Sequence, residues 1–362
     1  MRSAQVLNHF NYCFVVISTL LLGACSSPLV VDERLAGTEL QIAAVGDMML
    51  GTDYPKNTLA DDDGVSLLQD VAPVLRSTDL TFGNLEGVLL DGGVPAKTCK
   101  TLSACYLFRT PTRYAKYLKQ AGFDVMSLAN NHARDFGEEG RSSSMRALAE
   151  VGIHHTGRLG DVASMRVKGL RVAVIAFAPF GNSHDMLDTE KAVEKVKALA
   201  ETHHIVLVST HGGAEGLDAT HVPFEEEFYH GENRGDVVAF SRAVIDAGAD
   251  MVLGHGPHVP RALELYKGRL IAYSLGNFCT HWGISVASLK GLAPILVANL
   301  GADGRFLSGQ IVSARQVRPD GPKLDSQHTA AKLIAELTRE DFPETELDID
   351  DRGRIRLKPQ QQ

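Results

Sequence analysis

The chain has 362 residues, a formal net charge of −8 and 44% hydrophobic residues. Its lysines and arginines are mixed with acidic residues and form no basic stripe, which excludes electrostatic binding of nucleic acid. The length beyond the N-terminal segment suits one α/β domain, because a single hydrophobic core extends to roughly 250–300 residues.

The N-terminus has the pattern of a bacterial signal peptide. Arg2 supplies a positive charge, the apolar stretch Phe14–Leu22 follows, and Leu-Gly-Ala-Cys ending at Cys25 matches a lipobox. This stretch is shorter than the roughly 20 apolar residues that span a bilayer, which favours a cleaved signal over a permanent membrane helix. We expect residues 1–24 to be removed and Cys25 to carry lipid.

The predicted mature protein is exported and held on a membrane by its acyl chains. Ser26 after the cysteine resembles the sorting signal of Gram-negative lipoproteins, so we expect the periplasmic face of the outer membrane. Residues 25–39 are predicted to form a tether and residues 40–319 the main domain. Residues 320–362 are predicted to form a polar C-terminal extension.

The remaining cysteines fit an oxidising compartment. Cys99 and Cys105 bracket a short loop that a disulfide can close, whereas Cys279 would stay unpaired. Zinc binding by the pair is the alternative interpretation. It is weaker, because the sequence has no second Cys/His pair at the spacing of a structural zinc site.

Short apolar runs alternate with helical patterns from residue 40 onward. This alternation predicts an α/β fold with parallel strands, and a later hairpin of Ile295–Leu300 with Phe306–Gln316 predicts antiparallel strands. The predicted parallel strands are Gln41–Val45, Asp79–Phe82, Phe123–Leu128, Arg171–Ala178, His204–Ser209, Met251–Leu253 and Leu270–Ser274. The predicted helices are Thr112–Gly122, Glu139–Val151, Thr189–Ala200, Asp236–Ala247 and Thr329–Thr338.

Residues that commonly bind metals follow four of the apolar runs. In α/β proteins the carboxyl ends of the strands meet at the place where sites are built. Oxygen and imidazole donors together suit zinc, manganese or iron better than calcium. We therefore expect one or two divalent cations, and a pair of them would lower the pKa of a bridging water. The candidates are Asp47, Glu86, Asn131, His132, His211, His255 and His258.

Each candidate taken alone has an ordinary structural explanation. Asp and Asn cap helices and form turns, and most loop histidines are merely solvated. The grouping of these residue types at successive strand ends favours a site.

Six motifs in order resemble the CapA family of capsule-synthesis proteins, whose fold belongs with the calcineurin-like metallophosphoesterases. That fold is a layered α/β arrangement with mixed sheets and a metal site at the carboxyl ends of the strands. The resemblance runs from about Gln41 to Phe278. Its motifs are Gly46–Gly51, Asn84–Glu86, Leu128–His132 with Asp135–Gly137, His211–Glu215, Gly254–His258 and Tyr273–Phe278.

The resemblance implies roles for individual residues. Catalysis is assigned to His132, as acid or electrostatic stabiliser, and to Asp47. Glu215, Asp135 and Asn277 are expected to contact the substrate or to support the ligands. The implied metal ligands are Asp47, Glu86, Asn131, His211, His255 and His258.

The chain departs from the related patterns at two positions. Metallophosphoesterases have Asp-x-His at the first motif, where this chain has Asp47-Met48-Met49, so one imidazole is lost and occupancy by a single metal becomes an alternative. Many CapA relatives have His-Trp-Gly where this chain has His211-Gly212-Gly213, so the aromatic residue beside that histidine is absent.

The resemblance implies a metal-dependent hydrolase in the production of a capsule or exopolymer of the poly-γ-glutamate type. We expect phosphoester hydrolysis ahead of γ-glutamyl amide hydrolysis. The expected partners are the membrane through the lipid, an anionic envelope polymer or phosphorylated substrate, and other capsule-synthesis proteins. The alternative is a non-catalytic component that binds polymer or assembles the envelope, because fold alone does not fix function.

Overall fold

The computed structural model describes residues 35–97 and 106–359. The predicted signal peptide, the lipidation site Cys25 and the predicted disulfide Cys99–Cys105 lie outside these ranges. Within them, no helix is both long enough and apolar enough to cross a bilayer. Cys279 is buried and free, as predicted, and burial raises the pKa of its thiol to about 12.

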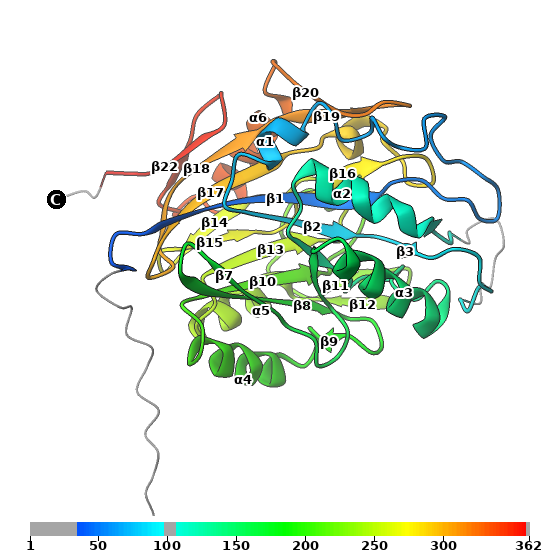
Figure 1. Ribbon diagram of the computed structural model, residues 1–362. Helices are drawn as coiled ribbons and strands as arrows, with labels where there is room; N and C mark the ends of the chain where they lie inside the picture. Colours follow the sequence, from blue (N-terminus) through cyan, green and yellow to red (C-terminus); the bar gives the residue numbers. More distant parts are fainter. Residues whose placement is uncertain (1–34, 98–105, 360–362) are drawn as a thin grey trace, which may run out of the picture.

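Two mixed β-sheets form the centre of the molecule (Figure 1). The first, with nine strands, has the order β21 (Leu347–Ile349), β22 (Arg354–Leu357), β18 (Phe306–Val312), β17 (Ile295–Gly301), β1 (Glu39–Met49), β2 (Leu80–Leu85), β5 (Val125–Ser127) and β6 (His154–Thr156), with β16 (Asn277–Thr280) beside β1. The second, with seven strands, has the order β14 (Leu263–Tyr266), β15 (Arg269–Ala272), β13 (Met251–His255), β10 (Ile205–His211), β8 (Leu170–Ala178) and β7 (Ala163–Val167), with β9 (His184–Asp185) beside β8.

The remaining elements are helices and short strand pairs. The helices are α1 (Ala72–Leu75), α2 (Ala115–Ala121), α3 (Gly137–Glu150), α4 (Thr189–Ala200), α5 (Val237–Asp246) and α6 (Thr329–Asp341), with 3₁₀ turns at Thr112–Tyr114, Leu217–Ala219 and Ser288–Gly291. The strand pairs are β3 (Val88–Leu89) with β4 (Arg109–Thr110), β11 (Glu227–Tyr229) with β12 (Glu232–Gly235), and β19 (Ala314–Val317) with β20 (Gly321–Leu324).

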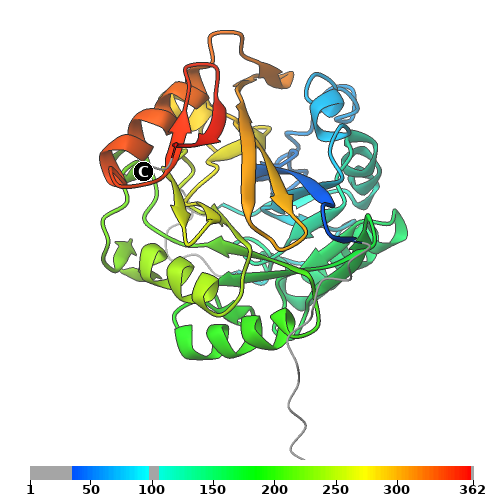
Figure 2. The same cartoon turned by 90° about the vertical axis from the view of Figure 1, so that its left-hand side faces the viewer.

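The sheets pack face to face and helices cover their outer faces (Figure 2). Alternate residues of β1, such as Ile42, pack between the sheets with residues of the second sheet such as Leu207. The intervening residues, such as Ala43, pack outward with α2. On the far side, Val206 packs against α4 and α5. This period-two alternation gives both sheets two buried faces, which explains the continuous apolar runs in the sequence.

The predicted layered α/β architecture with mixed sheets is confirmed. Strands β1, β2, β5 and β6 pair in parallel, as do β8, β10, β13 and β15. The predicted hairpin forms antiparallel strands β17 and β18 and joins the first sheet rather than a separate one. Helix α4 has the predicted bounds because Asp188 accepts a hydrogen bond from the Lys191 amide and caps its first turn.

Four predicted strands end too early, because β1, β2, β10 and β13 continue beyond their apolar runs to Met49, Leu85, His211 and His255; β1 is extended furthest. The apolar run suggested that it ends at Val45, whereas β1 continues to Met49. The extension exists because β16 pairs with it in parallel, with Asn277 opposite Asp47. Asp47 therefore lies within a strand and not in the loop that follows one.

Glycines let the chain cross between the two sheets beside the candidate site. A methyl group on Gly46 would overlap the carbonyl oxygen of Gly276, and one on Gly254 would overlap that of Tyr273. The absence of a side chain at both positions allows the segment from Tyr273 to Gly276 to lie against β1 and β13. This close approach brings the strand ends of the two sheets to one place.

Residues 320–359, the described part of the segment predicted as a C-terminal extension (residues 320–362), contribute to the core. Strand β22 pairs with β18, and Ala331 and Ile334 of α6 pack in the core between the sheets. Helix α6 begins at the predicted Thr329 and continues three residues beyond the predicted end at Thr338.

An ion pair between His221 and Asp341 at the end of α6 predicts a pH-dependent contribution to stability. Nδ1 of His221 lies 2.7 Å from Oδ1 of Asp341, and this hydrogen bond raises the pKa of the half-exposed histidine. A raised histidine pKa stabilises the folded state fully below the unfolded value near 6.5. The contribution disappears as pH rises through the folded pKa. We expect His221→Gln to lower the free energy of unfolding by about 0.5 kcal/mol at acidic pH, after solvent screening.

Urea unfolding of wild type and His221→Gln at pH 5.5 and pH 9 measures this difference. We expect the two proteins to differ at pH 5.5 and to converge at pH 9. A difference of equal size at both pH values would show that the histidine acts through packing instead.

Candidate metal centre

Strand ends from both sheets place the predicted ligands in one region. Asp47 lies in β1, and Glu86 follows β2 directly. His211 and His255 are the last residues of β10 and β13 and lie opposite each other in register. His258 follows in the loop after β13, where its backbone adopts a left-handed conformation with φ of 59°. The parallel pairing of these strands explains why residues remote in sequence meet.

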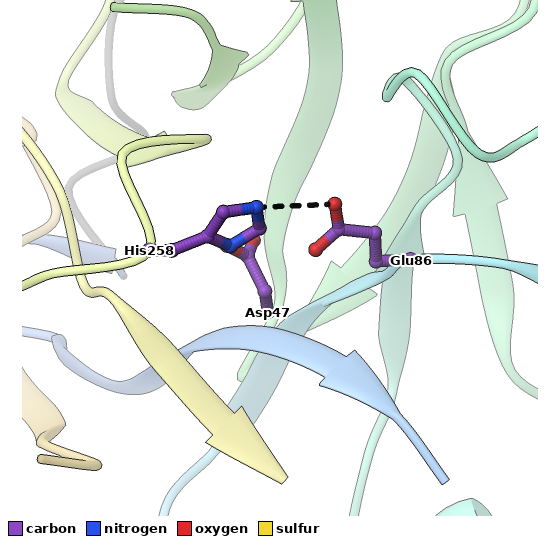
Figure 3. Close-up of side chains that lie close together, drawn as sticks. All are labelled: Asp47, Glu86 and His258. Carbon is purple, nitrogen blue, oxygen red and sulfur yellow. Dashed lines mark ion pairs between the residues drawn. The ribbon is translucent and has the colours of Figure 1, made fainter. Parts of the chain in front are cut away.

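Asp47, Glu86 and His258 form a compact cluster (Figure 3). One ligand atom from each lies within 4.8 Å of the others. Nδ1 of His258 is 3.0 Å from Oδ2 of Asp47, and Nε2 is 3.7 Å from Oε1 of Glu86. Both carboxylates are completely buried. Two buried acids facing one imidazole are the kind of donors that surround a cation in proteins.

The charges within the cluster shift the pKa of each member. Burial alone would raise the pKa of Asp47, but the hydrogen bond and charge of His258 outweigh it and hold this pKa well below 3.8. Burial raises the pKa of Glu86 well above 4.5, and the charge of His258 opposes it only in part. Burial would lower the pKa of His258, but Glu86 and Asp47 raise it to about 10. Without a cation, the protonated ring of His258 balances the charge of the ionised Asp47.

Several buried polar atoms around the cluster have no hydrogen-bond partner among the described residues. They are both side-chain oxygens of Glu86, Oδ1 of Asn131 and Nε2 of His211. Buried polar atoms in folded proteins are nearly always paired, so such a group calls for a bound ion or water. Carboxylate and amide oxygens with an imidazole nitrogen fit manganese, zinc or iron. The residues present therefore suit a divalent cation.

Asn84, which the sequence reasoning did not select, connects His211 to the cluster. Its side-chain amide donates to Oδ1 of Asp47 at 2.8 Å and lies 3.3 Å from Nδ1 of His211. Its oxygen accepts from the amide of Asn130 at 3.1 Å. The signal for Asn84 was its place in the Asn-Leu-Glu motif, directly opposite Asp47 in the strand register.

His211 and His255 differ in what their rings contact. Burial lowers the pKa of His211 well below 6.5, which leaves the ring neutral and able to donate a lone pair. His255 instead has Nε2 at 3.0 Å from the carbonyl oxygen of Val45 and Nδ1 at 3.3 Å from that of Thr210. His211 is thus the better placed of the two to add a nitrogen donor.

His132 lies in the loop after β5 and forms a pair with Asp135. Its Nδ1 donates to Oδ2 of Asp135 at 2.8 Å, and its ring packs against that of Phe108 with centroids 4.3 Å apart and the ring planes tilted by 36°. Burial lowers the pKa of His132, and the charge of Asp135 only partly opposes this. The ring is therefore neutral near pH 7. Because Asp135 fixes the proton on Nδ1, Nε2 is the acceptor nitrogen.

The other predicted contacts, Glu215 and Asn277, both lie beside His258. Oδ1 of Asn277 is 3.0 Å from Nδ1 of His258, and Oε2 of Glu215 is 3.7 Å from Nε2. Arg234, which the sequence reasoning missed, donates to Oε1 of Glu215 at 2.9 Å. Asn277 and Glu215 therefore lie beside the two ring nitrogens of His258, and Arg234 holds Glu215 in place.

An aromatic ring lies beside His211 although the sequence has glycine at position 212. The ring of Phe180, from the loop after β8, lies edge-on to the ring of His211, with the two centroids 5.9 Å apart. The guanidinium carbon of Arg234 lies 5.0 Å from the centroid of the Phe180 ring. A side chain at Gly212 would meet Sδ of Met186 at 2.5 Å and the carbonyl oxygen of Arg234 at 2.7 Å. A tryptophan at 212 therefore has no room, and Phe180 supplies the ring.

The profile of the family described as bacterial capsule synthesis protein PGA_cap matches residues 41–281. The chain belongs to this family. The matched region contains every predicted ligand, which confirms the resemblance seen in the motifs. The family assignment covers β1 through β16, so the C-terminal strands and α6 lie beyond the match.

Two relatives of this PGA_cap protein are named CapA. It is 29% identical over 266 residues to the capsule biosynthesis protein CapA of Bacillus anthracis, covering 66% of this chain and 59% of that protein. It is 28% identical over 318 residues to the PGA biosynthesis protein CapA of Bacillus subtilis, covering 83% and 78%. The chain thus spans about three fifths of the first relative.

A solved structure with a similar arrangement is the 5′-nucleotidase precursor from Thermus thermophilus. The TM-score is 0.42 at 12% identity, covering 84% of this chain and 59% of that chain.

Proposed function

We propose that this PGA_cap protein is an exported, lipid-anchored hydrolase that needs a divalent metal and cleaves a phosphoester in capsule or exopolymer production. The observation that carries the proposal is the buried cluster of Asp47, Glu86 and His258, surrounded by polar atoms without partners among the described residues. Burying two acids costs free energy, and a cation at this place offsets that cost.

Asp47, Glu86 and His258 would hold the metal, with His211 and Asn131 as further donors. When bound, a divalent cation supplies Lewis acidity, which polarises the bond to be broken and lowers the pKa of water. Asn84 keeps Asp47 and His211 oriented through its amide. The closed packing of the strand ends excludes solvent, which strengthens every electrostatic interaction in the site.

His132 is the residue that would move protons. Its Nε2 accepts a proton from the attacking water while Nδ1 remains bonded to Asp135. The resulting positive ring is stabilised by Asp135 and can return the proton to the leaving oxygen. Phe108, packed against the ring, restricts its orientation.

The rival proposal is a polymer-binding role without turnover, and position 49 favours it. Metallophosphoesterases have a histidine there, whereas Met49 is buried and its sulfur accepts from the Gly51 amide at 3.3 Å. The site has one imidazole fewer, which suits weaker or single metal occupancy.

Assays of the full chain in detergent separate the two roles. We expect the metal-loaded protein to hydrolyse a phosphomonoester or phosphodiester, to lose this activity with EDTA, and to regain it with manganese or zinc. A loaded protein that leaves both phosphoesters and γ-linked glutamate oligomers intact would favour the binding role. Cleavage of the glutamate oligomers alone would assign the hydrolysis to the amide bond.

A further inference from the structure

A cationic pocket of about 300 Å³ lies beside the metal centre. Its walls come from the segment before position 98, the loop after β5, the start of α3 and the loop after β8. Lys97, Arg134 and Arg141 line it, and the amides of Asn130 and Asn131 complete the polar wall. No acidic residue is among its lining residues in the part of the chain that is described.

The positive charges around this pocket exceed the acids that could balance them. Three arginines converge on Glu138, with Arg134 Nε at 2.8 Å, Arg141 Nη2 at 2.5 Å and Arg158 Nε at 3.7 Å. One carboxylate neutralises one of these three guanidinium groups. Lys97 adds a fourth cation and lies 3.5 Å from Oδ1 of the buried Asp135, so four cations share the two carboxylates of Glu138 and Asp135.

Arg141 shows the imbalance most clearly. It is 1% exposed, and its Nε has no hydrogen-bond partner among the described residues. Its Nη1 donates to the carbonyl oxygen of Asn182 at 2.9 Å. Arg141 shares its ion-pair partner Glu138 with Arg134 and Arg158, so an anion in the pocket would balance the positive charge that one carboxylate leaves over.

Contacts of its lining residues connect the pocket with the metal centre. Asn130 of the pocket wall donates to Oδ1 of Asn84 at 3.1 Å, and Asn84 donates to Oδ1 of Asp47 at 2.8 Å. Asn131, whose Oδ1 is buried without a partner in the described structure, belongs to the pocket wall and is a candidate ligand. Phe180 also lines the pocket and packs against the ring of His211. A ligand with one group at Asp47, Glu86 and His258 can therefore place its neighbouring group in the pocket.

We propose that this pocket binds a second anionic group of the substrate, a carboxylate or a phosphate, next to the bond that reacts at the metal centre. The substrate class is then a polyanion, which Arg134, Arg141 and Lys97 select by charge-assisted hydrogen bonds. This inference rests on the proposed function for the identity of the reacting bond. The pocket's affinity for an anion does not depend on turnover.

Calorimetric titration of the full chain in detergent and EDTA tests the proposal. The probes are inorganic phosphate and a γ-linked tetraglutamate, which distinguish a phosphate from a carboxylate as the bound group. We expect at least one probe to bind wild type. Arg134→Ala and Lys97→Ala, both at partly exposed side chains, should each weaken that binding by at least about tenfold, the equivalent of one charge-assisted hydrogen bond.

Arg146→Ala is the matched control, because Arg146 is an exposed arginine of the same helix that carries Arg141. It should bind like wild type. Wild type that binds neither probe, or Arg134→Ala and Lys97→Ala that bind as tightly as wild type, would overturn the pocket assignment. Binding with the expected variant pattern in a protein that hydrolyses no ester would contradict the phosphoesterase proposal and leave the pocket standing.

Discussion

Glu86→Gln should abolish the stabilisation that a divalent metal gives to this protein without weakening the metal-free fold. Both Glu86 oxygens are buried and have no hydrogen-bond partner among the described residues, so the neutral amide breaks no hydrogen bond and loses only the ion pair at 3.7 Å with His258. Metal at one hundred times its Kd should stabilise wild type by about 2.7 kcal/mol. Loss of a ligand should weaken binding by more than about 100-fold, which removes this gain. Thermal unfolding of wild type and variant in EDTA measures the stability of the metal-free protein, and unfolding with manganese or zinc measures that of the metal-bound protein.

Glu264→Gln is the control for this prediction. Glu264 is also a buried acid, but it is bound by Arg242 at 2.7 Å and by the hydroxyl of Tyr273. Its replacement should lower stability by about 2 kcal/mol with or without metal, because it breaks satisfied hydrogen bonds. If Glu86→Gln kept the full metal-dependent gain, Glu86 would not be a ligand.

His132→Ala should reduce phosphoester hydrolysis by about 10²- to 10⁴-fold, the usual contribution of a general acid–base group. The metal-dependent stabilisation should remain, because His132 bonds Asp135 and packs against Phe108 outside the three-residue cluster. Steady-state rates of metal-loaded wild type and variant measure the loss of hydrolysis. Thermal unfolding with and without metal measures the metal-dependent stabilisation.

His154→Ala, at an exposed histidine of β6, is the matched control and should keep the wild-type rate. Loss of metal-dependent stabilisation in His132→Ala would place the histidine among the ligands. An unchanged rate in the variant would remove it from the proton transfer.

The sequence was sufficient to predict those residues of the candidate site that lie at the carboxyl ends of the apolar strands. Apolar runs identify buried strands, and parallel strands bring their carboxyl ends together, so Asp47, Glu86 and His258 could be named before any contact was known. The helix Thr189–Ala200 was predictable to the residue because its cap and apolar spacing are local. Features that depend on residues close together in the chain could therefore be predicted from the sequence.

Features that depend on contacts between segments far apart in the chain could not be predicted from the sequence. Asn84 acquires its role from strand register, which places it opposite Asp47. Phe180 fills the space beside His211 from a loop in another part of the chain, and nothing in the local sequence signals it. His255 shares a motif with His258, yet its ring nitrogens lie against backbone carbonyl oxygens. Residue type and spacing do not determine these orientations.

Elemental analysis of the full chain, purified in detergent without chelators, tests the metal centre most directly. The account predicts at least about one manganese, zinc or iron ion per chain, lost in Glu86→Gln and retained in Glu264→Gln. Wild type that carries no such ion and takes none up from manganese or zinc solutions would contradict it.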